Sequence, residues 1–282
     1  MAVPKQALEI TILNLNFSGQ SCNFLNTHPN SRIDTILAYI VKQFESGSDV
    51  IVLQEGRNCD GTPTMQEWLG RLPSNIGSII KPYGENVEKY SFYLVTLYNR
   101  NRVTLEGMLH SIYDSPKRDR SFLATCFNKK GVVYTVVNTH LSMVEDEKDA
   151  AIRDLISTFG KSKHIFICGD LNFFMDQRGG QQIEELMRTF VHRSGHNIAL
   201  TDGTALQGSY IGWFYDKQKK LDKEKLSALL NVFSSADMVP IFAFVPDSTV
   251  ELLKNWLKWN ANEKTDEPAP YFSDHLSITV RF

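Results

Sequence analysis

The sequence predicts an α/β fold in which two mixed β-sheets pack together and helices cover their outer faces. Three observations lead to this prediction. Short segments rich in valine, isoleucine, phenylalanine and threonine recur along the 282 residues, and several alternate apolar and polar positions as strands do. Helical periodicity separates some of these segments, where a crossover would link two strands. Other neighbouring segments are joined by short turns, which is typical of antiparallel hairpins.

Eight segments are predicted to be strands on this basis. They cover residues 8–16, 49–55, 92–99, 121–128, 132–141, 164–170, 229–235 and 276–282. The stretches "FYLVTLYNRNRVTLEGM" and "SFLATCFNKKGVVYTVVN" are interpreted as meanders or hairpins, because only a short turn divides each of them.

Four segments have the apolar spacing of amphipathic helices. They cover residues 31–46, 144–160, 181–193 and 249–259. Ser31 is the expected N-cap of the first helix, and Ser142 with Glu145 has the spacing of a capping box for the second. The first two helices each link two predicted strands, so they are expected to be crossovers on the outside of the sheets.

The composition is that of an ordinary globular protein, with 42% hydrophobic and 22% charged residues. No linker or repeat divides the chain, so we expect one domain over residues 1–282. A net charge of -2 argues against a protein that coats nucleic acid through overall positive charge. It leaves room for a local basic groove, for which "KRDR" (117–120) and "KQKKLDKEK" (217–225) are candidates, although such mixed runs are more often solvated loops.

The four cysteines are scattered without a C-x-x-C pair, and Cys168 lies in an apolar strand, which favours a reducing compartment. The first ten residues lack the layout of a signal peptide, and no apolar stretch approaches 18 residues. We therefore expect a cytoplasmic protein without a membrane segment, and a monomer.

Polar side chains follow the apolar part of several predicted strands. They are Asn14, Glu55, His140, Asp170, Asn172, Asp274 and His275. Any one of them has an ordinary explanation, since Asx and Glu residues often end strands in turns. In an α/β fold, however, strand ends converge on one rim, and ligands bind there. So many polar groups on one rim predict a functional site.

The chemical types of these side chains also fit together. Carboxylates and amides without cysteine are hard oxygen ligands suited to Mg²⁺ or Mn²⁺, whereas zinc would need more histidine or cysteine. Histidines can donate hydrogen bonds to phosphoryl oxygens, and a remaining carboxylate can take a proton from an attacking water. The set predicts metal-assisted hydrolysis of a phosphoester.

Five motifs in order, "LNLNFSG", "VIVLQEGRN", "NTHLS", "GDLNF" and "SDHLSI", span nearly the whole chain. Together they resemble the endonuclease/exonuclease/phosphatase superfamily, to which pancreatic deoxyribonuclease, deadenylases, neutral sphingomyelinases and inositol polyphosphate 5-phosphatases belong. The resemblance implies a four-layer α/β/β/α sandwich of two packed mixed β-sheets and a Mg²⁺- or Mn²⁺-dependent phosphoesterase.

The resemblance also implies roles at the metal side of the site. Glu55 in "LQE" is similar to the main metal ligand of the family, with Asn14 beside it, and Asp274 resembles a further carboxylate there. Arg57 matches an arginine that deoxyribonucleases use near the substrate backbone, although a surface loop residue would look the same.

The remaining roles concern the reacting groups. Asp170 resembles the residue that orients or deprotonates the attacking water, and Asn172 the amide that holds this residue and the phosphate. His140 in "NTH" and His275 in "SDH" resemble the histidines that contact the phosphate.

The sequence departs from the family pattern in three places. Asn16 stands where several branches have an acidic residue, which puts a second metal in doubt. Asn231 stands where the family has the aspartate that orients the histidine of "SDH", although Asp222 or Asp237 could be the partner instead. Residues 236–272 form an insertion that is either packed down by its tryptophans or forms a wall of the site.

Another aromatic cluster, "GSYIGWFYDK", follows a Gly-Ser pair near the expected cleft, and Trp213 within it either stacks on a base or belongs to the core.

The predicted function is hydrolysis of phosphodiester bonds, with nucleic acid as the first choice of substrate. The first alternative is a phosphomonoesterase or a lipid-head-group hydrolase, since "GDLNF" is similar to the 5-phosphatases, but their "PAW-x-DR" element is missing. The second alternative is a binding protein with a decayed site, which Asn16 and Asn231 would explain.

Overall fold

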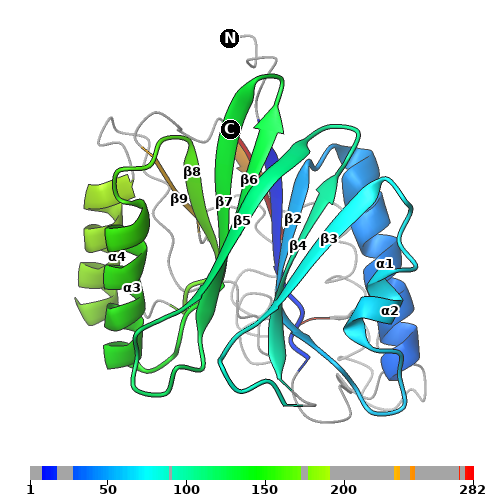
Figure 1. The fold of residues 1–282 in the computed structure, drawn as a ribbon, viewed down its shortest axis with the longest axis horizontal. Helices are drawn as coiled ribbons and strands as arrows, with labels where there is room; N and C mark the ends of the chain where they lie inside the picture. The colour runs from blue at the N-terminus through cyan, green and yellow to red at the C-terminus, as the bar shows by residue number, and fades with distance from the viewer. Residues whose placement is uncertain are drawn as a thin grey trace, which may run out of the picture.

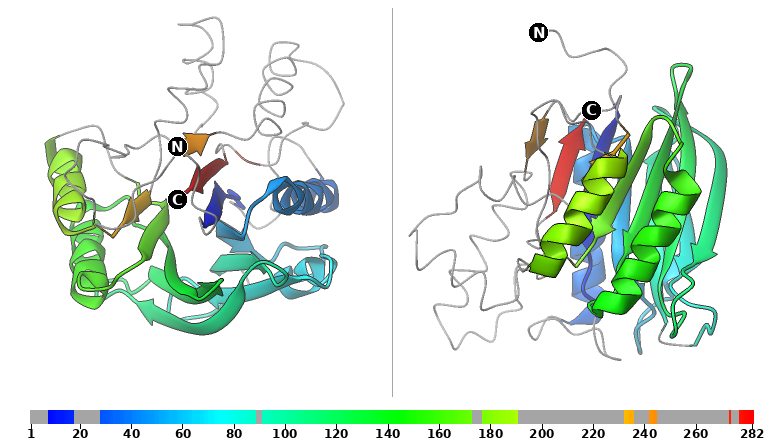
Figure 2. Two further views of the ribbon diagram at one scale, coloured as in Figure 1. Left: turned by 90° about the horizontal axis from the view of Figure 1, so that it is seen from above. Right: turned by 90° about the vertical axis from the view of Figure 1, so that its left-hand side faces the viewer.

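The computed structural model describes residues 8–17, 28–88, 91–172, 177–190, 232–235, 242–244, 273 and 277–282. Within these residues the chain forms two mixed β-sheets that pack against each other, with helices outside both of them (Figure 1). The left-hand view in Figure 2 shows the helices on the two flanks and the sheets between them. This arrangement confirms the predicted α/β/β/α sandwich.

The first sheet has the strand order β10-β11-β1-β2-β4-β3. Its strands are β1 (Glu9–Asn14), β2 (Val50–Arg57), β3 (Ile76–Pro82), β4 (Phe92–Asn99), β10 (Phe242–Phe244) and β11 (Ile278–Arg281). β1 and β2 are parallel, and the other neighbours are antiparallel. Helix α1 (Pro29–Ser46) connects β1 to β2, as a parallel pair requires. The short helix α2 (Met65–Leu69) follows β2 and lies near α1 (Figure 1).

The second sheet has the order β5-β6-β7-β8-β9. Its strands are β5 (Thr104–Ile112), β6 (Ser121–Lys129), β7 (Val132–His140), β8 (Ile165–Asp170) and β9 (Val232–Ser234). β7 and β8 are its parallel pair, and helix α3 (Glu145–Phe159) is their crossover. Helix α4 (Gln177–Phe190) lies beside α3 on the outer face (Figure 2).

Three apolar layers hold the sandwich together, and the strands next to the centre contribute to two of them. In β2, Val50 and Val52 face the second sheet, whereas Ile51 and Leu53 face α1. The same alternation occurs in β8, where Phe166 packs between the sheets. Strands buried on both faces read as continuous apolar runs, which is why these segments were so clear in the sequence.

The helix starts differ from the predicted ones. Helix α1 begins at Pro29, whose missing N–H costs nothing at the first helical position, and the imidazole of His28 caps it in place of Ser31. Helix α3 has Val144 as its N-cap, without a side-chain capping bond. The predicted capping box at Ser142 is therefore wrong, because Ser142 lies two residues before the cap and its hydroxyl bonds to Glu147 instead (2.6 Å).

Some predicted connections were also wrong. β4 and β5 do not form a hairpin: the turn between them carries the chain from one sheet to the other. Strand β3 and helix α2 were missed, and β10 lies inside the insertion of residues 236–272, where it adds an edge strand next to β11. The helix expected at 249–259 lies outside the described residues.

Two further expectations have outcomes here. Cys126 and Cys168 are free, but Cys59 is disulfide-bonded, so the expectation of reduced cysteines is not met at that position. In the described part of the chain, no helix combines the length and the apolar character that crossing a membrane would need.

A pair of buried amides connects the two sheets near one end. Gln54 in β2 donates from Nε2 to Oδ1 of Asn138 in β7 (2.7 Å), and both side chains are fully buried. The Nδ2 of Asn138 donates in turn to the backbone carbonyls of Leu53 (3.1 Å) and Val95 (2.9 Å). The β2·β4 ladder has a β-bulge between Leu53 and Gly56. Asn138 therefore supplies hydrogen bonds at the place where the ladder is interrupted.

Replacement of Asn138 by leucine is expected to destabilise the protein strongly. Leucine fills a similar volume but makes no hydrogen bonds. The amide of Gln54 would lose its acceptor and the buried carbonyls of Leu53 and Val95 would lose their donor, and each unsatisfied group costs about 1 to 3 kcal/mol of stability. Chemical denaturation should show a fall in the free energy of unfolding of about 3 kcal/mol or more. The exposed Asn101→Leu is the control and should change it little; equal stabilities of the two variants would contradict the role given to Asn138.

Ser142→Ala is expected to make stability less dependent on pH. The pKa of Glu147 is lowered, and the largest cause is the hydrogen bond from Ser142. Burial of the carboxyl raises the pKa by a smaller amount, and the nearby Lys117 lowers it further. A lowered pKa stabilises the fold above the pKa of the unfolded carboxyl, about 4.3, and this gain disappears as the pH falls through the folded value.

The loss in Ser142→Ala should thus be about 1.5 kcal/mol at pH 7 and smaller below pH of about 4. Thermal or urea unfolding across this pH range measures the difference. Ser157→Ala on α3, where the hydroxyl bonds a backbone carbonyl, should give a loss that does not change with pH. A Ser142→Ala loss that is the same at pH 7 and pH 3 would argue against this coupling.

Candidate active site

Five of the predicted site residues lie together where the parallel strands of both sheets end. Asn14 ends β1, Glu55 lies near the end of β2, His140 ends β7 and Asp170 ends β8, with Asn172 two residues beyond. His140 and Asp170 are direct neighbours in the parallel register of β7 and β8. β1 and β2 pack against β7 and β8, so the ends of the two parallel pairs meet across the sandwich.

Asn14 connects the two carboxylates of the site. Its Nδ2 donates to Oδ2 of Asp170 (2.9 Å) and to Oε1 of Glu55 (3.2 Å), and its Oδ1 accepts from the backbone N–H of Asn16 (2.8 Å). The donor side of this amide faces Glu55, so Asn14 stabilises the carboxylates here by hydrogen bonds. Its role as a metal ligand stays a prediction.

His140 lies between the same two carboxylates. Its Nδ1 is 3.7 Å from Oε1 of Glu55, and its Nε2 is 3.7 Å from Oδ2 of Asp170. Closer partners fix the ring: the hydroxyl of Tyr83 is 3.0 Å from Nδ1, and Nδ2 of Asn172 is 2.9 Å from Nε2. The imidazole is thus held on both nitrogens and is almost fully buried.

Tyr83 is a site residue that the sequence analysis missed. It is buried just after β3, and its hydroxyl accepts the backbone N–H of Glu55 (2.5 Å) while it bonds His140. Burial, and then the charge of Glu55, raises the pKa of Tyr83 well above its usual value, so the phenol keeps its proton at neutral pH. The guanidinium of Arg120 lies 5.2 Å from the centre of the ring. No local pattern around Tyr83 indicated this role, because β3 itself was not predicted.

The turn after β8 positions Asn172. Its backbone N–H donates to Oδ1 of Asp170 (3.2 Å), and its Nδ2 also donates to the carbonyl of Leu141 (2.9 Å). The φ angle of Asn172 is 49°, in the left-handed region that asparagine tolerates better than most residues. Both oxygens of Asp170 are thereby hydrogen-bonded, one by Asn172 and one by Asn14.

The remaining predicted residues divide into two groups. Arg57 lies two positions beyond Glu55, and its guanidinium is 4.9 Å from the centre of the Phe92 ring. Trp213, Asn231, Asp274 and His275 lie outside the described residues. Ser273, the first residue of "SDH", is described, and its hydroxyl donates to the backbone carbonyl of Asn14 (2.5 Å).

The site combines two carboxylates, an imidazole and two amides, which are the types of group that a hydrolytic site uses. Among the residues that the structure describes, no group of three or more His, Cys, Asp or Glu side chains has the geometry to hold a metal ion. Glu55 has 19% of its side-chain surface exposed, against 7% for Asp170 and 6% for His140. Of these three groups, Glu55 is therefore the one that a hydrated ion can reach most easily.

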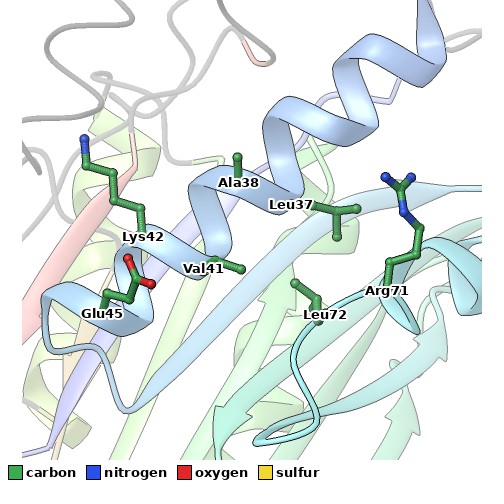
Figure 3. A pocket seen from close by; sticks show the side chains of 7 residues that line it. All are labelled: Leu37, Ala38, Val41, Lys42, Glu45, Arg71 and Leu72. Carbon is green, nitrogen blue, oxygen red and sulfur yellow. The ribbon is translucent and has the colours of Figure 1, made fainter.

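A separate hollow of about 540 Å³ lies on the outer side of the first sheet (Figure 3). Side chains of α1 and the segment after α2 line it, among them Leu37, Val41, Lys42 and Arg71. None of the carboxylates or imidazoles of the strand-end site belongs to this lining, so the hollow is not part of the candidate active site.

Comparison with protein-family models finds no match to the chain, and comparison with curated proteins finds none either. Solved structures do match it. They include the endonuclease/exonuclease/phosphatase from Bacteroides vulgatus, at 15% identity and a TM-score of 0.61, with 98% of both chains covered. D. rerio TDP2 complexed with a single-strand DNA product matches at 15% identity and a TM-score of 0.59, also over 98% of both chains.

The catalytic domain of human Nocturnin with a bound sulfate anion matches at 15% identity and a TM-score of 0.60, over 98% of this chain and 93% of that one. At these identities the similarity concerns the fold. Over almost its whole length, the chain has the fold of the endonuclease/exonuclease/phosphatase proteins, as its motifs predicted.

Proposed function

We propose that the protein is a divalent-metal-dependent phosphoesterase that hydrolyses phosphodiester bonds, with nucleic acid as its substrate. The observation that carries this proposal is the convergence of Asn14, Glu55, His140, Asp170 and Asn172 at one end of the sandwich. Neighbouring groups of this set lie within hydrogen-bond distance or 3.7 Å of one another, although they come from four strands, and the bonded pair Asn14 and Asp170 is 156 positions apart in sequence.

The charges of the site favour a cation as cofactor. A phosphodiester is an anion, and two carboxylates would repel it unless a positive charge lies between them and the phosphate. Mg²⁺ and Mn²⁺ prefer carboxylate oxygens and keep several waters, so Glu55 and Asp274 would suffice as protein ligands, with Asn14 beside them. When bound, such an ion would stabilise the charge that develops on the phosphoryl oxygens.

Asp170 is suited to take the proton of the attacking water. Hydrogen bonds from Asn14 and Asn172 hold its two oxygens, one each, so the carboxylate keeps a fixed direction. A carboxylate has about four lone-pair sites, so it can accept hydrogen bonds from several donors, an attacking water among them.

His140, Asn172 and His275 are proposed to bind the phosphate. His140 and Asn172 contact each other through Nε2 and Nδ2 (2.9 Å), and a phosphoryl oxygen that approaches this pair would replace this contact by hydrogen bonds to itself. The Tyr83 bond keeps the other nitrogen of His140 occupied and fixes the plane of the ring. Fixed donors of this kind stabilise charge that appears in the transition state.

Nucleic acid is the proposed substrate for two reasons. Arg57, the last residue of β2, is proposed to contact a substrate backbone, and the aromatic cluster with Trp213 is proposed to stack on a base. In addition, the fold is shared with TDP2, which was solved with single-strand DNA product. A phosphomonoester and a lipid head group remain the alternatives that an assay must separate.

Loss of either central reacting group should abolish most of the activity. Asp170→Asn preserves the volume of the side chain and His140→Asn keeps a polar side chain there, and each is expected to lower kcat at least about a hundredfold, since one preorganised group of this kind is worth that much. The assay is hydrolysis of a fluorescent oligonucleotide with Mg²⁺, and thermal unfolding verifies the fold.

His164→Asn and Asp154→Asn are the matched controls. His164 precedes β8 at the opposite end of that strand, and Asp154 lies on α3, where it accepts a backbone N–H. Both controls should keep near-full activity. If His140→Asn and Asp170→Asn also keep it while the wild type is active, the assigned site is wrong.

The metal and the substrate can be tested together. Activity on an oligonucleotide should disappear with a chelator and return with Mg²⁺ or Mn²⁺, because the site offers only hard oxygen ligands for the ion. The oligonucleotide should be cleaved faster than an inositol phosphate or sphingomyelin. Preference for one of the other two would replace the nuclease proposal by that alternative, and failure on all three with any of the metals would favour a binding protein.

A further inference from the structure

Lys148 is a fully buried lysine beside the candidate active site. It lies in the first turns of α3, and none of its side-chain surface is exposed. Two effects oppose a cation there. Removal of an ammonium group from water is costly, and the N-terminal part of a helix carries positive partial charge. Strong local contacts must offset both effects.

Two of these contacts are visible. The ammonium group pairs with Oε1 of Glu145, one helical turn earlier (3.0 Å), and donates a hydrogen bond to the backbone carbonyl of Asn172. The other carboxylate oxygen of Glu145 accepts from Nε2 of Gln182 in α4 (2.7 Å). The lysine is therefore fixed to the helices at one end and holds the turn after β8 at the other.

The contact with Asn172 completes a set of restraints on this one residue. Asp170 accepts its backbone N–H, and Leu141 and His140 engage its side-chain amide. Lys148 holds the backbone carbonyl. Rotation about φ of Asn172, which is 49°, would move its carbonyl and its side chain together, so a contact that holds the carbonyl also restrains the direction of the side chain.

We propose that Lys148 is a positioning residue of the active site, which acts through Asn172. The buried ammonium group keeps the Asn172 turn in its left-handed conformation, and the turn aims the amide at His140 and at the phosphate. Lys148 itself does not touch the substrate. This inference rests on the proposed function, in which Asn172 binds the phosphate and holds Asp170.

The first experiment compares Lys148→Met with Lys129→Met. Lys129 is the matched control, because it is also largely buried and ion-paired, to Asp49 (2.5 Å), at the opposite end of the sheets. Both variants are expected to lose stability. Only Lys148→Met should lower kcat per folded molecule, by on the order of ten- to a hundredfold, as misplacement of a reacting group does, with KM changed less than kcat.

The second experiment is a double-mutant cycle with Asn172→Ala. If Lys148 acts through Asn172, then Lys148→Met should cause no further fall in kcat once the Asn172 amide has been removed. Lys148→Gln, whose side chain ends one atom sooner than lysine and has no charge to bury, takes the place of Lys148→Met if that variant does not fold.

The outcomes separate this inference from the proposed function. If Asn172→Ala lowers kcat but both Lys148 variants keep it, Lys148 is structural and only this inference fails. The same conclusion follows if the two effects add fully in the double mutant. If Asn172→Ala itself keeps full kcat, the role of Asn172 in the proposed function fails, and the inference fails with it.

Discussion

The hydrogen bond between Gln54 and Asn138 sets the two sheets in the relative position on which the site depends. Glu55 directly follows Gln54 in β2, and His140 lies two residues after Asn138 in β7. An apolar interface between sheets is not directional, so apolar contacts alone tolerate small sliding movements. A buried amide pair with fixed geometry does not, because a shift leaves polar atoms unsatisfied. Glu55 and His140, which are 3.7 Å apart, both lie within two residues of this restraint.

The bulge in β2 determines the direction of the Glu55 side chain, and Asn138 also contacts this bulge. In a regular strand, alternate residues face opposite sides, and the bulge between Leu53 and Gly56 breaks that alternation. Asn138 donates to the Leu53 carbonyl at the start of the bulge, and Tyr83 accepts the N–H of Glu55 within it. One side of the irregular backbone is therefore held by the second sheet and the other by a buried phenol.

The sequence was sufficient for the sandwich and for the polar rim, and the reasons lie in particular residues. Buried runs such as "VIVLQ" and "HIFIC" have a clear apolar signal, and the polar residues that follow them mark the strand ends. Strand β3 has an exposed serine and a proline, and β10 has three residues, so neither gave such a signal. Ser31 and Ser142 fitted local capping rules. However, α1 begins earlier, at Pro29, and the hydroxyl of Ser142 donates its hydrogen bond to Glu147 and does not cap α3.

Tyr83 and Lys148 could not be identified from the sequence for a different reason. Their contacts with His140 and Asn172 span 57 and 24 positions, and no local spacing encodes them. A tyrosine or a lysine is by itself common on protein surfaces, and only burial next to a reacting group makes either of them informative. Gln54 and Asn138 are different, because each is visible in the sequence as an amide within a mainly apolar strand, and a buried amide there needs a hydrogen-bond partner.

The backbone around the site stores conformational strain, and this strain is better explained by function than by stability. Asn16, Glu55 and Asn172 have φ angles of 48°, 53° and 49°. Each such residue costs about 1 kcal/mol or more, and a protein selected only for stability would have little reason to place three of them within one cluster.

Other groups hold each of these conformations in place. Asn14 accepts the N–H of Asn16, Tyr83 that of Glu55 and Asp170 that of Asn172. Every restraint therefore comes from a residue that also belongs to the site. The polar groups fix one another, so the proposed reaction would need little reorganisation of the site, which is the condition under which fixed dipoles and charges lower a barrier most effectively.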